Sequence, residues 1–172
     1  MHALVFHGPG EKAWESVPDP SIVDATDAVV RIDSSTICGT DLHIMKGDTP
    51  EVKAGRILGH EAVGTVVEVG AAVTTVAVGD RVLVSCVSSC GRCRFCKEGH
   101  YGICSGGGGW IFGYMIDGLQ AEFARVPFAD TSLYKVPAAL SDEQVLFLAD
   151  ILPTAYEVGV LNGRIEPGDT VA

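Results

Sequence analysis

The chain has 172 residues, 47% of them hydrophobic and 20% charged, and its 12 basic and 22 acidic side chains give a formal net charge of −10. This length suits one globular domain with a sizeable core, and the apolar content excludes an intrinsically disordered chain. No apolar run reaches the roughly 18 residues of a membrane span, and the acidic balance disfavours nucleic acid or an anionic membrane surface as a partner.

The N-terminus does not resemble a signal peptide, because residues 1–10 carry no Lys or Arg and their apolar run stops at Gly8-Pro9. Most of the chain that follows reads as short strands rich in Val, Ile and Thr, which glycine-containing turns separate. The expected strands are 3–6, 28–37, 62–69, 82–87 and 121–126. This pattern is typical of an antiparallel barrel or sandwich.

Two helices are expected after residue 140. Ser141 is an N-cap with acidic residues in the first turn, and an apolar helical stretch follows over 145–149. The second helix runs from about residue 153 to 161 and stops at Asn162-Gly163. Residues 167–169 form a turn, and residues 170–172 look like the opening of a buried strand.

Four cysteines have the spacing C-x2-C-x2-C-x7-C: Cys90, Cys93, Cys96 and Cys104. Two-residue gaps let successive sulfurs converge on one ion and the fourth closes a tetrahedron, so this is a structural zinc pattern whose metal stabilises a small lobe. An iron–sulfur cluster and incidental buried cysteines are the alternatives, but no Cys-Pro ending follows the run. His100 is expected at the surface. Cysteines spaced as metal ligands favour the reducing cytoplasm.

A second group of candidate ligands is dispersed along the chain. It contains Cys38, the pair His60-Glu61, and Asp150. Taken singly, each is more often a packed residue than a ligand, but a catalytic zinc needs three protein ligands plus an open position. Asp150 is the candidate third ligand, because a carboxylate in so apolar a stretch is costly to bury unless it is paired or binds a metal. Cys86 is expected to be a buried or half-buried strand cysteine.

Together these motifs resemble the zinc-dependent medium-chain alcohol dehydrogenases. The resemblance rests on Cys38-Gly-Thr-Asp-Leu-His43, Gly59-His-Glu with Gly64 and Gly70 after it, Val78-Gly-Asp-Arg-Val82, the four cysteines, and Asp150-Ile-Leu-Pro-Thr154. It implies a mainly β fold with some α-helix (α+β): a GroES-like antiparallel β-barrel with peripheral helices over residues 1–165 and a zinc-bound loop lobe at about 88–106. Residues 166–172 would begin a Rossmann cofactor domain that the sequence does not continue.

The resemblance also implies a catalytic zinc site. Cys38 and His60 match the first two ligands, and Asp150 matches the third, where many members have cysteine. Aspartate there is typical of a Cys/His/Asp subgroup that is often associated with secondary alcohols. Asp41 matches a carboxylate that orients the histidine ligand. Glu61 matches a glutamate behind the zinc that can transiently ligate it, with a buried structural acid as the alternative.

Further positions match residues that handle the proton, the cofactor and the substrate. Thr40 matches the hydroxyl that hydrogen-bonds a zinc-bound alcohol, and His43 matches the imidazole that ends the proton relay. Thr154 matches a contact to the nicotinamide ring, and Gly39 is assigned to the same cofactor site. Trp110 is a candidate for the wall of the substrate pocket, with ordinary packing as the alternative.

The implied function is the reversible oxidation of a primary or secondary alcohol to an aldehyde or ketone, by zinc-alkoxide formation and hydride transfer to NAD or NADP. Two zinc ions per chain are expected, one catalytic and one structural. The full-length protein is expected to be a cytoplasmic homodimer or homotetramer that binds neither nucleic acid nor membrane, and these 172 residues alone are expected to be inactive.

Two other functions fit the same residues. One is a zinc-binding or interaction module with a GroES-like fold and no catalysis. The other is a zinc hydrolase, for which Glu61 is the sole candidate general base. A strand followed by G-x-G-x-x-G beyond residue 172 would favour the dehydrogenase, and an immediate stop codon would favour the module.

Overall fold

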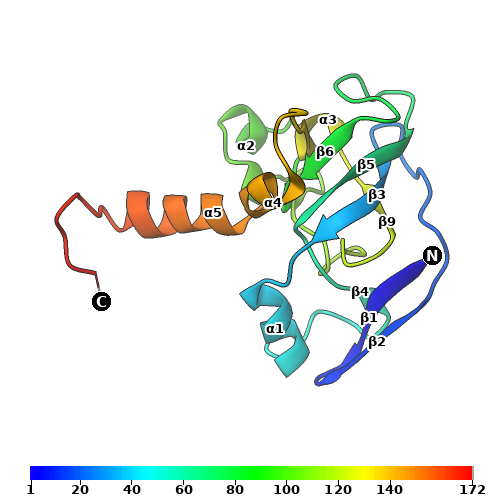
Figure 1. The fold of residues 1–172 in the computed structure, drawn as a ribbon, viewed down its shortest axis with the longest axis horizontal. Helices are drawn as coiled ribbons and strands as arrows, with labels where there is room; N and C mark the ends of the chain where they lie inside the picture. The colour runs from blue at the N-terminus through cyan, green and yellow to red at the C-terminus, as the bar shows by residue number, and fades with distance from the viewer. Residues whose placement is uncertain (172) are drawn as a thin grey trace.

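The computed structural model describes residues 1–171 and shows a β-rich body with short helices around it (Figure 1). The strands are β1 His2–Gly8, β2 Glu11–Ser16, β3 Ala28–Ser35, β4 Arg56–Ile57, β5 Ala62–Val69, β6 Arg81–Val84, β7 Val87–Ser88, β8 Gly109–Trp110, β9 Phe123–Val126 and β10 Leu133–Lys135. The α-helices are α1 Gly39–Lys46, α2 Arg94–Lys97, α3 Ala129–Ser132, α4 Asp142–Val145 and α5 Ile151–Thr154. The predicted mainly β fold with peripheral helices is confirmed.

The strands form three antiparallel sheets. The largest has the order β10-β6-β5-β3-β9, and the second has the order β2-β1-β4. A bridge between Ala3 and Ala121 connects β1 to the segment before β9. Within residues 1–171, these sheets do not close into a single hydrogen-bonded barrel, so the predicted barrel is an open arrangement of sheets.

The third sheet is the pair β7-β8, in which Val87 lies opposite Trp110 and Ser88 opposite Gly109. The prediction of one continuous strand over 82–87 is wrong at Cys86, because β6 ends at Val84 and Cys86 lies in a bend. The Cys86 backbone N–H donates to the Ala149 carbonyl oxygen at 3.1 Å instead of to a strand partner. The side chain is half-buried, as predicted.

The main core lies on the large sheet, where valines of β3, β5, β6 and β9 pack with Phe112 and Leu119. These valines are Val30, Val66, Val82, Val84 and Val126. Gly64 lets β3 and β5 approach closely, because a Cβ at this position would lie 2.2 Å from the Arg31 carbonyl oxygen. The strand predicted at 28–37 ends earlier, at Ser35, and the chain then leaves the sheet to enter α1.

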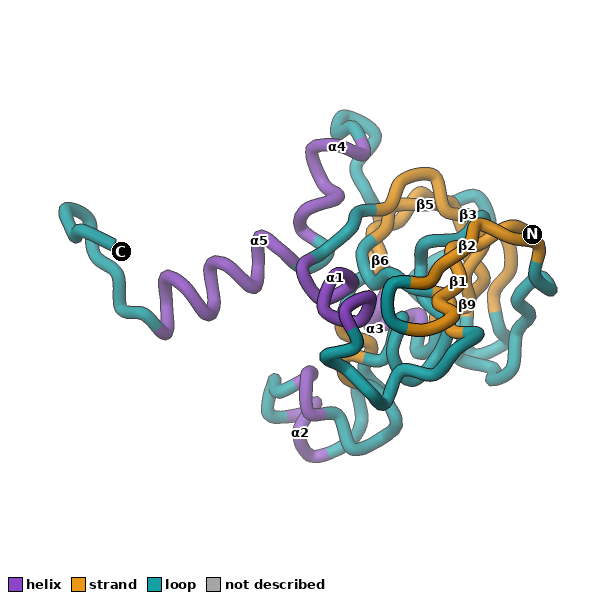
Figure 2. Tube along the Cα trace, turned by 90° about the horizontal axis from the view of Figure 1, so that it is seen from below, coloured by secondary structure: helices purple, strands orange, loops and turns teal. Residues whose placement is uncertain are grey.

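Two helices follow the body, as the sequence predicts. Ser141 caps α4, and its backbone N–H donates to Gln144 Oε1 at 2.9 Å. A 3-10 turn over Leu146–Leu148 continues it. The second helix consists of α5 and a π-helical continuation, Ala155–Asn162, so it begins two residues before the predicted start and ends at the predicted stop. It projects away from the sheets (Figures 1 and 2).

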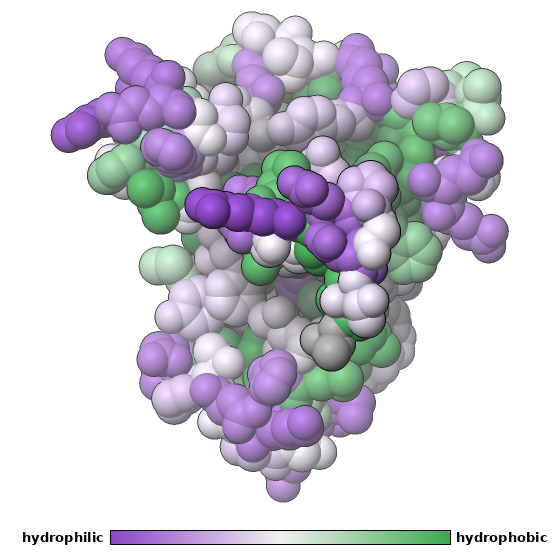
Figure 3. All heavy atoms as spheres, turned by 90° about the vertical axis from the view of Figure 1, so that its left-hand side faces the viewer, coloured by the Kyte–Doolittle hydropathy of each residue, from purple (hydrophilic) through white to green (hydrophobic). Residues whose placement is uncertain are grey.

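The surface of this projecting helix is unusually apolar. Residues 151–162 are all exposed. The large hydrophobic side chains among them are Ile151, Leu152, Tyr156, Val158, Val160 and Leu161. Figure 3, which views the molecule from this side, shows hydrophobic side chains in green between polar ones. Within residues 1–171, no single helix is long and apolar enough to cross a membrane, whereas the pair Asp142–Leu148 and Ile151–Asn162, bent by 46°, meets that test by length and composition.

The chain end differs from the prediction. The turn at 167–169 is present, because the Asp169 N–H donates to the Glu166 carbonyl oxygen at 3.1 Å. The strand expected at 170–172 is not formed at residues 170 and 171, and Val171 is 67% exposed. This segment extends beyond the body, so no neighbouring strand lies beside it to pair with (Figure 1). Ala172 lies outside the described residues.

Candidate metal centres

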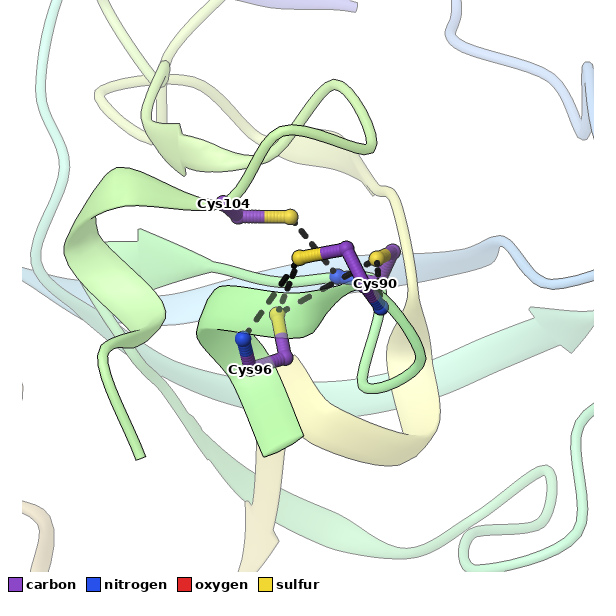
Figure 4. Close-up of side chains that lie close together, drawn as sticks. Cys90, Cys96 and Cys104 are labelled. Atoms are coloured by element: carbon purple, nitrogen blue, oxygen red, sulfur yellow. Dashed lines mark hydrogen bonds between the residues drawn. The ribbon is translucent and has the colours of Figure 1, made fainter. Parts of the chain in front are cut away.

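The four lobe cysteines converge on one point. Their sulfurs all lie within 4.8 Å of one another, with 3.4 Å between the Sγ atoms of Cys93 and Cys96. Cys96 and Cys104 are buried and the other two half-buried. Figure 4 shows Cys90, Cys96 and Cys104 pointing toward one another from separate parts of the lobe. Four thiols in this arrangement provide the closed tetrahedral set of a structural zinc site.

The backbone of the lobe is arranged around the sulfurs. The N–H groups of Cys90 and Gly106 both donate to Cys104 Sγ, at 3.3 and 3.4 Å. Cys93 caps α2, where the Cys96 N–H is the main cause that lowers the pKa of Cys93 to about 5. Burial, together with the neighbouring sulfurs, raises the pKa of Cys96 to about 12. A divalent cation would remove this competition, because the four sulfurs would bind it as thiolates.

The second cluster brings together three distant segments. The ligand atoms of Cys38, His60 and Asp150 all lie within 4.8 Å of one another. Cys38 is the N-cap of α1, His60 precedes β5, and Asp150 is the N-cap of α5. His60 is 2% exposed, and its Nε2 lies 3.2 Å from Asp150 Oδ2.

This cluster fits a zinc ion. The His60 Nε2 is buried and, among the described residues, has no hydrogen-bond partner of good geometry. Burial opposes protonation of the ring, but Asp150 and Asp41 outweigh it and raise the pKa of His60 to about 9. His60 in turn lowers the pKa of Asp150. A cation that replaces the imidazole proton satisfies the same charges, and one sulfur, one nitrogen and one oxygen donor are ligands that zinc accepts.

The helix α1 holds Cys38 and the predicted orienting acid. The sequence analysis predicts no helix here, but Gly39–Lys46 is helical, with Asp41 at the third position. Asp41 is buried, and its Oδ2 accepts from the Cys38 N–H at 2.9 Å and from Gln120 Nε2 at 3.1 Å. Its Oδ1 lies 3.9 Å from His60 Nδ1. The sequence did not indicate Gln120, because it lies in an irregular segment before β9.

The structure places the other predicted site residues at different distances from this cluster. Thr40 is close, with its Oγ1 3.9 Å from Cys38 Sγ, and the Thr154 hydroxyl donates to Asp150 Oδ1. Gly39 is exposed at the start of α1. His43 lies on the exposed side of α1, where its side chain is 63% exposed and its Nδ1 is 2.7 Å from Asp48 Oδ2.

Aromatic rings lie against the histidine. The Trp110 ring stands edge-on to His60, at 6.1 Å between centroids and 88° between planes. On its other side, Trp110 is stacked with Tyr114 at 4.9 Å and 7°. The sequence singled out Trp110 without its partner. Tyr114 packs on the small core of Phe6, Ile44, Val52 and Leu58, so this stack connects the site to the body.

A cavity of about 220 Å³ opens beside the second cluster. It is lined by Thr40, Cys86, Val87, Trp110, Asp150 and Thr154. Thr40, Trp110, Asp150 and Thr154 are site residues predicted from the sequence. Cys86 and Val87 are not, and they reach the cavity because the chain bends after β6. Burial, with the Asp150 charge, raises the pKa of the Cys86 thiol. A larger cavity, of about 600 Å³, shares Cys86, Val87, Asp150 and Thr154 with it.

Comparison with known proteins agrees with this geometry. Residues 24–138 match the family model of the alcohol dehydrogenase GroES-like domain. The chain belongs to this family. The resemblance to zinc-dependent medium-chain alcohol dehydrogenases drawn from the sequence motifs is therefore confirmed, and several relatives are named as zinc-type or zinc-dependent alcohol dehydrogenases.

Relatives of this GroES-like domain match it over nearly its whole length. A medium-chain reductase/dehydrogenase, ucsI, of an Acremonium species is 44% identical and covers 91% of this chain and 53% of its own. An alcohol dehydrogenase of Cupriavidus necator is 41% identical and covers 100% and 50%. The apo form of zinc-dependent alcohol dehydrogenase 2 from Streptococcus pneumonia has a TM-score of 0.90 at 52% identity and covers 98% and 47%. The chain thus spans about half the length of the relatives it matches.

Proposed function

We propose that this chain is the metal-binding catalytic part of a zinc-dependent, NAD(P)-linked alcohol dehydrogenase. The observation that carries the proposal is the convergence of Cys38, His60 and Asp150 beside a cavity, with the buried His60 Nε2 lacking a hydrogen-bond partner among residues 1–171. Three protein ligands with room for a fourth, external one suit a catalytic zinc. The four-cysteine lobe, with its closed ligand set, suits a structural zinc.

The residues around the cavity suit alcohol oxidation. When bound to Cys38, His60 and Asp150, zinc supplies the Lewis acidity that lowers the pKa of an alcohol hydroxyl. Thr40 is on the cavity wall, within reach of that hydroxyl, and would accept its proton in a hydrogen bond. His43, on the exposed side of the same helix, would pass the proton to solvent.

The hydride acceptor would lie against the same cavity, where Thr154 and Gly39 are the proposed contacts and Trp110 shapes the substrate space. No G-x-G-x-x-G motif occurs in these 172 residues, so we expect this chain by itself to bind zinc without hydride transfer. Aspartate at position 150 favours secondary alcohols as substrates. Five thiols among the proposed zinc ligands suit a reducing compartment, the cytoplasm, and we expect the full-length enzyme to be a homodimer or homotetramer.

The full-length protein tests this proposal directly. We expect two zinc ions per chain by metal analysis, and reduction of NAD⁺ or NADP⁺ in the presence of a secondary alcohol such as propan-2-ol. Removal of the accessible zinc with a chelator should abolish the reaction, and added zinc should restore it. Two bound zinc ions without hydride transfer to any alcohol would instead favour a zinc-binding module.

His43→Ala is expected to change the pH dependence of the full-length enzyme more than its substrate binding. Only an unprotonated imidazole can accept the proton at the end of a relay, so loss of His43 should lower kcat/KM most toward the alkaline end of the range and should flatten the acid limb of the profile. The measurement is kcat/KM for one alcohol from pH 5.5 to 9, with Asp48→Asn as the control for loss of the hydrogen bond to His43 alone. A His43→Ala profile parallel to that of the wild type would remove His43 from the relay.

A further inference from the structure

Glu61 joins the three chain segments that carry the proposed ligands. It follows the histidine ligand directly and is 2% exposed. Each of its carboxylate oxygens has a different partner. Oε2 accepts a hydrogen bond from the hydroxyl of Thr36, two residues before the cysteine ligand. Oε1 accepts from the backbone N–H of Ile151 at 3.1 Å, one residue after the aspartate ligand.

The contact with Ile151 matters because it connects a buried side chain of the body to the first residue of α5, beyond Ala149, which the Cys86 N–H already holds. The first N–H groups of a helix have no partner within the helix. Asp150, the N-cap, makes no side-chain capping bond, so Glu61 supplies the acceptor for the first of these groups. Residues 151–162 are all exposed and contribute little packing that would fix where the helix begins.

The contact with Thr36 connects the same Glu61 carboxylate to the segment that leads to Cys38. Thr36 follows the last residue of β3, and the neighbouring Ser35 hydroxyl donates to the Glu61 backbone carbonyl at 2.9 Å. Among residues 1–171, the Thr36 hydroxyl is the side chain that donates to Glu61 Oε2. It therefore determines the rotation of the carboxylate about the Cγ–Cδ bond. Since both oxygens are engaged in this way, Glu61 is poised to connect segments rather than to ligate the metal.

We propose that Thr36 is a positioning residue for the metal site. Its hydroxyl orients the Glu61 carboxylate, and this carboxylate accepts the hydrogen bond from the Ile151 N–H. The second bond fixes the position of the neighbouring Asp150 relative to Cys38. The consequence for metal affinity rests on the proposed ligand set. The hydrogen-bonded link itself does not depend on the metal and can be measured without it.

Thr36→Val tests the link, because it keeps the shape of the side chain and removes the hydroxyl. In the metal-free chain, we expect the Ile151 amide to exchange with deuterium about 10-fold faster than in the wild type, as for loss of a charge-assisted hydrogen bond. With Co²⁺ as the probe, we expect the dissociation constant at the second cluster to rise by about 10- to 100-fold. The visible absorption of this Co²⁺ should shift, whereas the thiolate bands of the lobe should not.

Two matched variants separate this role from general destabilisation. Thr36→Ser restores the hydroxyl and should recover the Ile151 protection, the Co²⁺ affinity and the Co²⁺ spectrum. Ser35→Ala removes a neighbouring hydroxyl that contacts the Glu61 backbone but not its carboxylate, and it should leave all three unchanged. If Thr36→Val does not fold, Thr36→Ala is the second variant, since it also removes the hydroxyl, and the same changes are expected.

Unchanged Ile151 exchange in Thr36→Val, or in Thr36→Ala if that variant is needed, would overturn the proposal, and so would failure of Thr36→Ser to recover the wild-type values. Failure of the proposed function has a different signature. In that case the wild-type chain would take up metal in the lobe alone, while exchange at Ile151 would still report whether Thr36 and Glu61 hold the start of α5.

Discussion

Replacing Cys96 with serine is expected to remove one zinc ion per chain and to unfold the lobe over residues 88–106. The Cys96 Sγ is buried, 3.4 Å from that of Cys93 and 4.0 Å from that of Cys90, so a serine would leave the ion with three thiolates. The hydrophobic clusters within residues 1–171 include no side chain from 89–106. Metal binding therefore has to supply most of the lobe's stability, and structural zinc binding is worth about 10–16 kcal/mol in small metal-dependent units.

The measurements are zinc content and hydrogen exchange across the lobe, in the wild type and in the variant. Amides of the lobe, including those that donate to sulfur, should lose protection, while those of β3 and β5 should keep theirs. His100→Ala is the matched control, because His100 lies within the lobe sequence, is exposed and is not needed as a ligand. A Cys96→Ser chain that retains two zinc ions and a protected lobe would contradict the structural-zinc assignment.

Asp150→Asn is expected to weaken zinc binding at the second cluster and to leave the zinc of the lobe in place. The carboxylate lies 3.2 Å from His60 Nε2 and is the proposed oxygen ligand of the second cluster. The neutral amide is a much weaker ligand for zinc, so affinity at this cluster should fall by roughly 100-fold or more, beyond the usual effect of an outer-shell substitution. Hydride transfer by the full-length enzyme should fall with it, and the lobe should keep its zinc.

Zinc binding is measured by isothermal titration calorimetry, where Asp150→Asn should lose the binding step of the second cluster and keep that of the lobe. Glu157→Gln is the control, since it removes one acidic charge from the same helix at an exposed position. Equal loss of both zinc ions in Asp150→Asn would show that the clusters are not independent. Undiminished zinc binding would exclude Asp150 as a ligand.

The two metal clusters differ in how far the sequence could predict them. The lobe cysteines are close together in the chain, so their spacing alone indicates that they meet. Cys38, His60 and Asp150 come from segments far apart, so no spacing indicates that they meet, and the family resemblance was the main reason to group them. The contacts of Gln120, Thr36 and Tyr114 are tertiary, and no local pattern points to them.

The fold shows the same limit. The strand at 62–69 and the Ser141 cap were predicted correctly, because valine-rich runs and capping residues are local signals. The helix α1 was missed, because it is short, starts with glycine and is capped by Cys38 together with Asp41 rather than by the usual Ser or Thr. Cys86 was placed in a strand because nothing in its neighbours reveals that its N–H bonds to Ala149.

The pairing of β7 with β8 joins the two ends of the cysteine-rich lobe. Ser88 and Gly109 face each other across this ladder, and everything between them is the lobe. The lobe is therefore inserted at a point where the backbone is already joined on both sides. A gene that lost these codons would encode a short hairpin, with Val87 and Trp110 still paired at the cavity wall. A single deletion can thus remove the whole cysteine-rich insertion and leave the hairpin, whereas Cys38, His60 and Asp150 lie in three separate segments of the sequence.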